Sequence, residues 1–341
     1  MRLLARVTAR SFAESAKSAL SPLQVGVGVS SGAEHIIHMC KAQAHQIMAS
    51  PGSTEVIVQI DGKNAFNSIR RQFILDKILE DPAFSTLAHF FKWSYGTPSP
   101  LYDVDGLWFI DSATGVRQGD PLGPLFFALG LHSVLESLYR KFPDVNIHGY
   151  LDDITLTGDA SEVALAFKHL DGLLLEVGIV VNGAKSQAFC NPDMTASLTE
   201  SLGVVPVSSE GISVLGCPIG SDAYVRSEVT LILGKYSAIL PLVLQFSAKI
   251  SYQLLEQCIS KRPTYILRSV CPWLVETPAM VFDNRISKAI NAFIGQQISA
   301  NKVPPSSLLE LDNLPVLIER ADSVRALPRS MGGLGIRKAV D

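Results

Sequence analysis

The feature that most constrains this sequence is a pair of adjacent carboxylates, Asp152 and Asp153, set between two apolar β-type runs within residues 147–157. The segment contains no Asn-Gly or Gly-Gly pair to make a routine hairpin turn. Like charges side by side are costly unless a cation neutralises them. A solvated acidic turn is the simple alternative. Flanking runs this apolar favour a divalent cation such as Mg²⁺, which prefers carboxylate and phosphate oxygens.

Another carboxylate, Asp61, directly follows the β-branched run 56–60 and precedes a segment with helical spacing around Ile69 and Phe73. This position predicts a carboxylate at the end of a strand. Taken alone, Asp61 is equally well explained as a cap of the following helix, because Asp side chains accept hydrogen bonds from the first backbone N–H groups of helices.

Residues 115–126 form a turn-rich segment that opens into a long apolar helix reaching Leu138. Gly119 and Gly123 permit close approach of the backbone, and the start of a helix favours anions. Arg117 and Gln118 are therefore candidates for holding a phosphate or a sugar. A glycine-containing loop of this kind is not specific by itself.

Pattern divides the chain into three regions. Residues 1–50 predict a helix, a glycine-rich turn and a second helix over about 33–48, and residues 51–220 mix short strands with helices in packed layers. From about residue 222 the apolar spacing is helical. We therefore expect an α+β protein with a helical C-terminal part.

Charge is unevenly distributed along these regions. The whole chain has a net charge of −3, yet residues 51–220 carry 10 basic and 20 acidic side chains, and both flanking regions are mildly basic. An acidic centre can collect cations while basic flanks touch phosphates, but it is also compatible with a solvated surface. Charge alone does not decide the function.

The composition predicts a soluble intracellular protein without a membrane partner. Of the 341 residues 47% are hydrophobic, but no stretch of about 18 apolar residues occurs. The five cysteines are scattered, with no metal-ligand spacing, as expected of reduced thiols. The Arg- and Ser-containing stretch 1–20 has the composition of a mitochondrial transit peptide, but its apolar spacing favours an amphipathic helix.

Four motifs occur in the order in which reverse transcriptases carry them: Asp61 at a strand end, Arg-Gln-Gly-Asp-Pro-Leu at 117–122, Tyr-Leu-Asp-Asp at 150–153, and Asn-Gly-Ala-Lys-Ser at 182–186. The combination resembles the palm motifs of that family. Runs at 20–28 and 332–337 are similar to those of non-LTR retrotransposons, and 214–220 resembles the hairpin that grips the primer.

The resemblance implies a right-hand polymerase fold. Residues 51–220 would form the palm, an antiparallel sheet with packed helices, and 221–341 a helical thumb with a C-terminal extension. Residues 1–50 would be a partial fingers segment, because only 1–10 resemble the end of that region. Shortened fingers would weaken nucleotide binding by removing charge-assisted contacts to phosphates.

By resemblance, Asp61 and Asp152 are the main ligands of two Mg²⁺ ions, with Mn²⁺ as a substitute. Asp153 supports them, and the carbonyl of Gly62 adds a backbone ligand. Asn67 stands where many relatives have an aspartate. The resemblance places Phe66 beneath the sugar of the incoming nucleotide and the loop residues Arg117, Gln118 and Gly119 at the nucleotide or, for Arg117 and Gln118, at the template. It places Lys185 near the triphosphate, where the lysine also has a catalytic role.

The implied activity is that of an RNA-directed DNA polymerase, which copies an RNA template by adding deoxynucleoside triphosphates to a DNA or RNA primer. The family suggests a nuclear or cytoplasmic location over a mitochondrial one, and the sequence does not set the oligomeric state. An inactive remnant that folds as palm and thumb, and at most binds nucleic acid, is the alternative. An RNA-directed RNA polymerase shares the palm, but Phe66 and the Tyr-Leu-Asp-Asp form argue against it.

Overall fold

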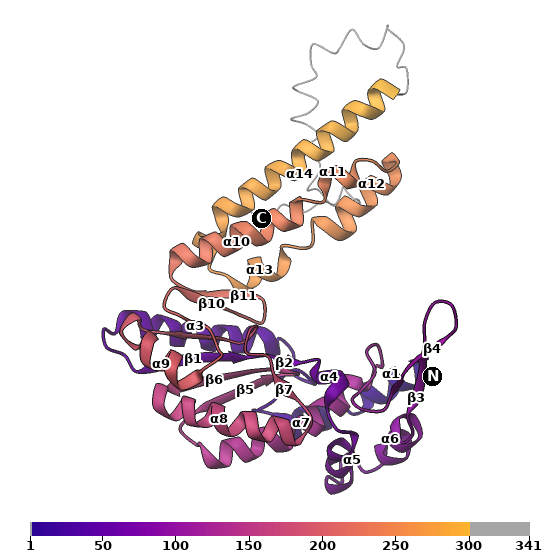
Figure 1. Ribbon diagram of the computed structural model, residues 1–341. Helices are drawn as coiled ribbons and strands as arrows, with labels where there is room; N and C mark the ends of the chain where they lie inside the picture. The colour runs from indigo at the N-terminus through magenta and orange to yellow at the C-terminus, as the bar shows by residue number, and fades with distance from the viewer. Residues whose placement is uncertain (1, 301–341) are drawn as a thin grey trace. The chain divides into compact units, whose positions relative to one another are not determined.

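The structure, a computed structural model, describes residues 2–300 (Figure 1). The chain divides into two compact units, residues 1–220 and the part from residue 221 onward, and each is described by itself. The run at 332–337 that resembles non-LTR retrotransposons lies outside the described residues.

A five-stranded sheet forms the centre of the first unit, in the order β5-β6-β1-β8-β9. Strand β1 (Glu55–Ile60) pairs antiparallel with β6 (Asp153–Asp159) on one side and with β8 (Gln187–Cys190) on the other. The outer strands are β5 (Asn146–Tyr150) and β9 (Val207–Ser208), the latter parallel to β8. The central place of β1 explains its continuous apolar run, because both faces of a covered central strand are buried.

Helices cover both faces of this sheet (Figure 1). Helix α3 (Gly32–Ala49) packs on one face, while α7 (Gly123–Lys141) and α8 (Ala160–Glu176) pack on the other. Most side chains of α7 from Leu125 to Leu138 are buried, so the long apolar helix predicted after the glycine loop is a core helix. The predicted strands at 56–60 and on both sides of the Asp pair are confirmed.

The N-terminal segment is made of two helices where one was expected. Helix α1 (Arg2–Ser11) ends before Phe12, and α2 (Ala13–Leu20) follows. The ring of Phe12 is stacked on that of Phe84, with centroids 6.0 Å apart, and this tertiary contact is not encoded in the local helical spacing. The predicted second helix is confirmed as α3.

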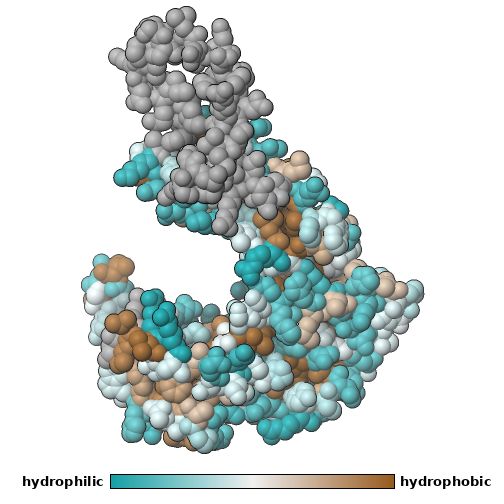
Figure 2. Space-filling view, turned by 180° about the vertical axis from the view of Figure 1, so that it is seen from behind, coloured by the Kyte–Doolittle hydropathy of each residue, from teal (hydrophilic) through white to brown (hydrophobic). Residues whose placement is uncertain are grey.

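Short elements complete the first unit. Helices α4 (Ala65–Ser68), α5 (Arg71–Glu80) and α6 (Leu87–Tyr95) follow β1, and a turn of 3₁₀ helix (Pro192–Met194) and α9 (Thr195–Leu202) follow β8. Three further strand pairs are β2 (Gly62–Lys63) with β7 (Val180–Val181), β3 (Ser99–Tyr102) with β4 (Trp108–Ser112), and β10 (Gly211–Val214) with β11 (Cys217–Gly220). The β3–β4 hairpin carries solvent-exposed apolar side chains (Figure 2), among them Val104, Trp108 and Phe109.

The second unit is helical throughout its described part, as expected. Helix α10 (Asp222–Ser237) is capped by the Ser221 hydroxyl and packs along α14 (Pro272–Ala300). Between them lie α11 (Leu240–Val243), α12 (Ala248–Leu254), a π-helical turn (Leu255–Ile259) and α13 (Thr264–Ser269). Within residues 2–300, no helix has the length and hydropathy needed to cross a bilayer.

Candidate active site

Asp61 stands at the end of the central strand, and both its backbone and its side chain are held by the segment after β7. The backbone N–H of Asn182 donates to the Asp61 carbonyl over 2.8 Å, and the Asn182 side-chain amide donates to Asp61 Oδ2 over 3.0 Å. The Asp61 N–H donates to Ser186 Oγ over 3.1 Å. Asp61 does not cap the next helix, since Asn64 occupies that position. The helix-cap alternative is therefore wrong.

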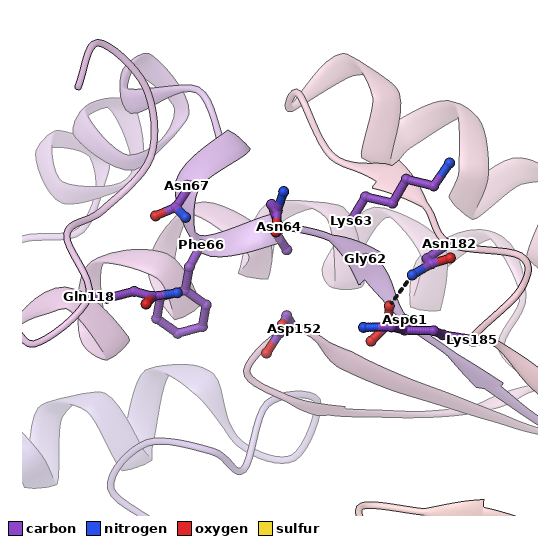
Figure 3. Close-up of a pocket in the computed structure, with 11 residues that line it drawn as sticks. Asp61, Gly62, Lys63, Asn64, Phe66, Asn67, Gln118, Asp152, Asn182 and Lys185 are labelled. Carbon is purple, nitrogen blue, oxygen red and sulfur yellow. Dashed lines mark hydrogen bonds between the residues drawn. The ribbon is translucent and has the colours of Figure 1, made fainter. Parts of the chain in front are cut away.

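Asp152 lies in the turn between β5 and β6. Tyr150 pairs with Asp153 across the hairpin, so Leu151 and Asp152 form a two-residue loop without glycine. Leu151 accordingly adopts a positive φ of 57°. The tight turn places the Asp152 side chain beyond the strand ends, on the side where Asp61 follows β1 (Figure 3).

Asp61 and Asp152 line one cavity of about 460 Å³. In the close-up, Asp61 and Lys185 lie on one side of this space, and Phe66 and Gln118 lie on the other (Figure 3). The cavity wall comes from four separate segments: residues 61–67, Gln118, Asp152, and the pair Asn182 and Lys185. Seven of the residues singled out in the sequence are thus brought together: Asp61, Gly62, Phe66, Asn67, Gln118, Asp152 and Lys185.

Asp153 is not among the residues that line the cavity, and a buried amide holds its side chain. The Nε2 of Gln59 donates to Asp153 Oδ1 over 3.1 Å, and Thr155 Oγ1 donates to Gln59 Oε1 over 2.7 Å, which fixes the orientation of Gln59. Burial, followed by repulsion from Asp152 and Asp61, raises the pKa of Asp153 to about 6. The Gln59 hydrogen bond opposes that shift.

The pKa of Asp152 is also raised, mainly by burial and further by the charge of Asp61, against a lowering by its own backbone N–H. Carboxylates held in this way favour a compensating cation, and oxygen-only donors suit Mg²⁺ and Mn²⁺. Within residues 2–300, no three His, Cys, Asp or Glu side chains are close enough to form a complete metal site by themselves. The donor chemistry fits a divalent cation that takes further ligands from a substrate, as Mg²⁺ commonly does.

Comparison with known proteins decides the family, because residues 1–219 match the family described as reverse transcriptase (RNA-dependent DNA polymerase). The chain belongs to the reverse transcriptase family. Two of its curated relatives are retrotransposon proteins, which supports the predicted non-LTR type. The structure itself confirms the expected α+β fold, a central sheet with packed helices.

Two curated relatives are similar over different lengths. The retrotransposable element SLACS 132 kDa protein of Trypanosoma brucei gambiense is 26% identical over 99% of this chain, which spans 26% of that protein. The Pol polyprotein from the type-1 retrotransposable element R2 of Nasonia vitripennis is 28% identical over 45% of this chain and 15% of its own length. The reverse transcriptase chain therefore spans about a quarter or less of these relatives.

Among solved structures, telomerase from Candida albicans resembles the chain with a TM-score of 0.46 and 11% identity, over 85% of this chain and 51% of the telomerase chain. Telomerase from Candida tropicalis gives the same TM-score at 10% identity, over 87% and 59% of the two chains. No conclusion about fold or function follows from likeness of this degree.

The Arg-Gln-Gly-Asp-Pro-Leu loop of this reverse transcriptase is held from beneath by a buried tyrosine. Tyr95 OH donates to Asp120 Oδ2 over 2.5 Å and accepts from the Arg117 N–H over 3.2 Å. Asp120 Oδ1 in turn accepts from the Leu122 N–H over 3.0 Å at the start of α7. These contacts fix both ends of the turn that carries Gln118.

The predicted nucleotide residues Arg117 and Gly119 do not line the cavity. The Arg117 guanidinium donates to the Ser94 carbonyl over 2.8 Å and to Ser99 Oγ over 2.6 Å, and it stacks over the Tyr95 ring. In the structure Arg117 therefore braces the loop against α6 and β3. Its assigned contact with the nucleotide stays a prediction.

A second arginine braces the same loop from α5. Arg71 also lies over the Tyr95 ring, with 5.2 Å from its guanidinium carbon to the ring centroid. Burial lowers the pKa of Arg71, and the charge of Arg117 lowers it further. Its guanidinium donates to a set of backbone carbonyls around the loop, those of Tyr95, Ser112, Thr114 and Gly115.

Phe66 is half-buried and packs in parallel on Phe127 of α7, with ring centroids 4.4 Å apart and an interplanar angle of 7°. One edge of the ring faces the cavity while its face rests on the core. An aromatic ring fixed in the cavity wall fits the position beneath the nucleotide sugar that the resemblance implies, and it fits an ordinary core residue equally well.

Sequence reasoning missed several residues of the site. Lys63 and Asn64 line the cavity, and Asn182 holds Asp61 by a hydrogen bond. The sequence assigned no role to Asn182 beyond its place as the first residue of the motif at 182–186. Asn64 has a left-handed backbone, with φ of 47°. Asn tolerates this conformation better than most residues, so an Asn at this position was the available sequence signal. Tyr95 and Arg71 offered no local signal, because their partners are far along the chain.

Proposed function

We propose that this chain is the polymerase core of an RNA-directed DNA polymerase of a non-LTR retrotransposon, and that the cavity between Asp61 and Asp152 is its active site. One observation carries the proposal. Two carboxylates from strand ends far apart in the sequence line one open cavity together with Gln118, Lys185 and Phe66. The membership in the reverse transcriptase family supplies the reaction class.

Two divalent cations, Mg²⁺ or Mn²⁺, would be held by Asp61 and Asp152, with Asp153 in support and the Gly62 carbonyl as a backbone ligand. The raised pKa values of Asp152 and Asp153 support this assignment, because buried and mutually repelling carboxylates gain most from a cation. When bound, such ions activate the primer 3′-hydroxyl and stabilise the leaving pyrophosphate.

The chain's own residues would position the deoxynucleoside triphosphate. Lys185 and Lys63 bring positive charge to a cavity whose other polar side chains are carboxylates and amides. A lysine there can neutralise phosphate charge or donate a proton to the leaving group. Gln118 presents an amide from the braced loop. Phe66, fixed by its stack on Phe127, would exclude a 2′-hydroxyl beneath the sugar and so select deoxynucleotides.

The partners that follow are an RNA template and a DNA or RNA primer. The curated relatives are retrotransposon proteins, whose reaction class requires both. The alternative, a folded remnant that binds nucleic acid without extending a primer, is the other outcome of the test below.

The test is primer extension on an RNA template with Mg²⁺ and deoxynucleotides, comparing the purified chain with Asp61→Asn and Asp152→Asn. Asp171→Asn, an exposed carboxylate on α8, is the matched control. Extension by the wild type and Asp171→Asn, with a loss of about a thousandfold or more in the two cavity variants, supports the proposal. No extension from folded wild-type protein, or equal extension from all four, overturns it.

A further inference from the structure

Gln24 is a polar side chain with no exposed surface, and all of its hydrogen bonds go to backbone groups. Its Nε2 donates to the Leu151 carbonyl over 3.0 Å, and its Oε1 accepts from the Leu151 N–H over 2.7 Å. The same Oε1 accepts from the Gly26 N–H over 3.1 Å. One amide thus binds both backbone groups of a single residue far along the chain.

Leu151 is the residue directly before Asp152 in the hairpin turn. Its φ of 57° lies in the left-handed region, which is uncommon for a bulky side chain and persists only where surrounding contacts enforce it. The Gln24 amide supplies such contacts, because it engages the donor and the acceptor of Leu151 together. The conformation of Leu151 in turn sets the direction in which the Asp152 side chain leaves the turn.

The backbone of the Gln24 segment is also joined to the hairpin. The Val25 N–H donates to the Gly149 carbonyl over 2.9 Å, and the Gly149 N–H donates to the Leu23 carbonyl over 2.7 Å. Residues 23–25 therefore run beside β5 as a short parallel addition to the sheet. This anchors the base of Gln24, so that its side chain reaches the turn from a fixed point.

Two glycines leave the space that the Gln24 amide occupies. A Cβ at Gly26 would lie 2.7 Å from the Leu151 nitrogen and 3.0 Å from Gln24 Oε1. A Cβ at Gly149 would lie 3.0 Å from Gln24 Nε2. A methyl group at either position would push directly on the contact between Gln24 and Leu151. Three positions of the sequence are thus shaped around one amide.

We propose that Gln24 is a positioning residue for Asp152: its amide locks the left-handed turn at Leu151 so that the Asp152 carboxylate faces Asp61 across the cavity. The inference rests on the proposed function for the role of Asp152, but its structural half is independent of polymerase activity. Gln24 itself touches no substrate or metal. Its effect passes through the Leu151 backbone.

The chemistry of position 24 is specific. An amide is the only uncharged side chain of this length that carries a donor and an acceptor side by side. Met has the same reach without either group. Glu keeps the acceptor for the Leu151 N–H but sets a second oxygen against the Leu151 carbonyl.

The experiment compares Gln24→Met and Gly26→Ala with the wild type. Gly26→Ala leaves Gln24 intact and displaces the same contact from the other side. Asn191→Leu is the matched control, because Asn191 is also a buried amide bonded to backbone carbonyls, at the opposite end of β1. Gly172→Ala, with no atom within 4 Å of its added Cβ, controls for the glycine change.

Three quantities are measured for each variant: the hydrogen-exchange rate of the Leu151 amide, the Mn²⁺ affinity by water-proton relaxation, and the rate of primer extension as a function of nucleotide concentration. In Gln24→Met and Gly26→Ala we expect faster exchange at Leu151 and about tenfold weaker Mn²⁺ binding, as is usual when the support of a ligand is lost. The maximal extension rate falls, and the KM for the nucleotide changes little.

Unchanged Leu151 exchange and Mn²⁺ affinity in both variants overturns the inference, and so does an equal loss of Mn²⁺ affinity in Asn191→Leu. If Gln24→Met does not fold, Gly26→Ala decides by the same criteria. If the wild type extends no primer while Mn²⁺ binding still depends on Gln24 and Gly26, the polymerase proposal fails and the positioning role stands.

Discussion

Asn182 binds Asp61 at two points, with its backbone N–H on the Asp61 carbonyl and its side-chain amide on Oδ2. The first bond joins the chain after β7 to the end of β1. The second restricts the carboxylate to one rotamer and leaves its other oxygen for the cavity. The residue that orients Asp61 thus comes from the same segment as Lys185, and both line the cavity.

Replacing Asn182 by Ala removes the side-chain bond and keeps the backbone bond. A hydrogen bond to a charged group contributes about 1.5–3 kcal/mol, so we expect the extension rate to fall by about tenfold to a hundredfold. Steady-state primer extension measures the effect. Asn146→Ala, an exposed residue at the start of β5, should retain the wild-type rate. Equal rates for the two variants would contradict the role of Asn182.

Removing one hydroxyl should loosen the loop that carries Gln118. In Tyr95→Phe the ring remains, but Asp120 and the Arg117 N–H lose a buried partner. The free energy of unfolding should drop by about 1–3 kcal/mol, measured by urea denaturation. Tyr102→Phe, at a tyrosine that is 61% exposed, is the control and should change little. A stability loss of equal size in both variants would show that the hydroxyl of Tyr95 has no special part.

Asp153 predicts a pH dependence whose sign follows from its raised pKa. The group titrates near 3.8 when unperturbed and at about 6 in the folded protein, so folding favours its protonated form. Ionised Asp153 therefore costs stability, and the cost appears as pH rises through the window from about 4 to 6 and is constant above it.

In Asp153→Asn this cost is absent. Without divalent cations, the Tm of the variant should exceed that of the wild type at pH 8, and the difference should shrink as the pH falls to 4. Thermal unfolding in the presence of a chelator measures both. Added Mg²⁺ should narrow the difference at pH 8 by stabilising the wild type. A difference that is independent of pH would mean that Asp153 is not the group responsible.

A substitution at Gly115 tests how closely the segment before Arg117 must approach helix α4, which follows Asp61. Its φ is 63°, and an added Cβ would lie 2.3 Å from the Phe66 carbonyl oxygen. Gly106, at the tip of the β3–β4 hairpin, has φ of 77° and no neighbour within 4 Å, so Gly106→Ala carries the backbone strain without the clash.

We expect Gly115→Ala to lower the free energy of unfolding by at least about 2 kcal/mol more than Gly106→Ala, because overpacking adds to the strain of a positive φ. Urea denaturation of both variants gives the difference. Equal losses would mean that the loop can move away from Phe66 without cost.

The secondary structure around the site was largely predictable, and the reasons are local. The run 56–60 and the run after the Asp pair are rich in β-branched residues, and the helix after Gly123 is mostly apolar, so period and composition sufficed there. The break between the first two helices at Phe12 was not predictable from the helical spacing, which is continuous there, and Phe12 instead contacts Phe84, a residue far along the chain.

The assembly of the site required more than local pattern. The spacing of Asp61 and Asp152 along the chain does not predict that they line one cavity. That prediction came from the order of the motifs, which matches the order in reverse transcriptases. The hydrogen bonds that hold the site residues in place could not be predicted from the sequence. Gln24 bonds to Leu151 and Tyr95 to Asp120, and both contacts join segments that only the fold brings together. In the sequence, Gln24 is distinguished only by its place in the run 20–28, which resembles those of non-LTR retrotransposons.

The central place of β1 also has a consequence for biosynthesis. A ribosome delivers the chain from its N-terminus, so β1 emerges well before β6 and β8, which pair with its two edges. Until then an apolar strand has both edges open, a state prone to pairing with other chains. Asp61 can therefore meet Asp152 and Asn182 only after those later segments have been made, and until β6 and β8 follow, the strand before Asp61 lacks both of its partners.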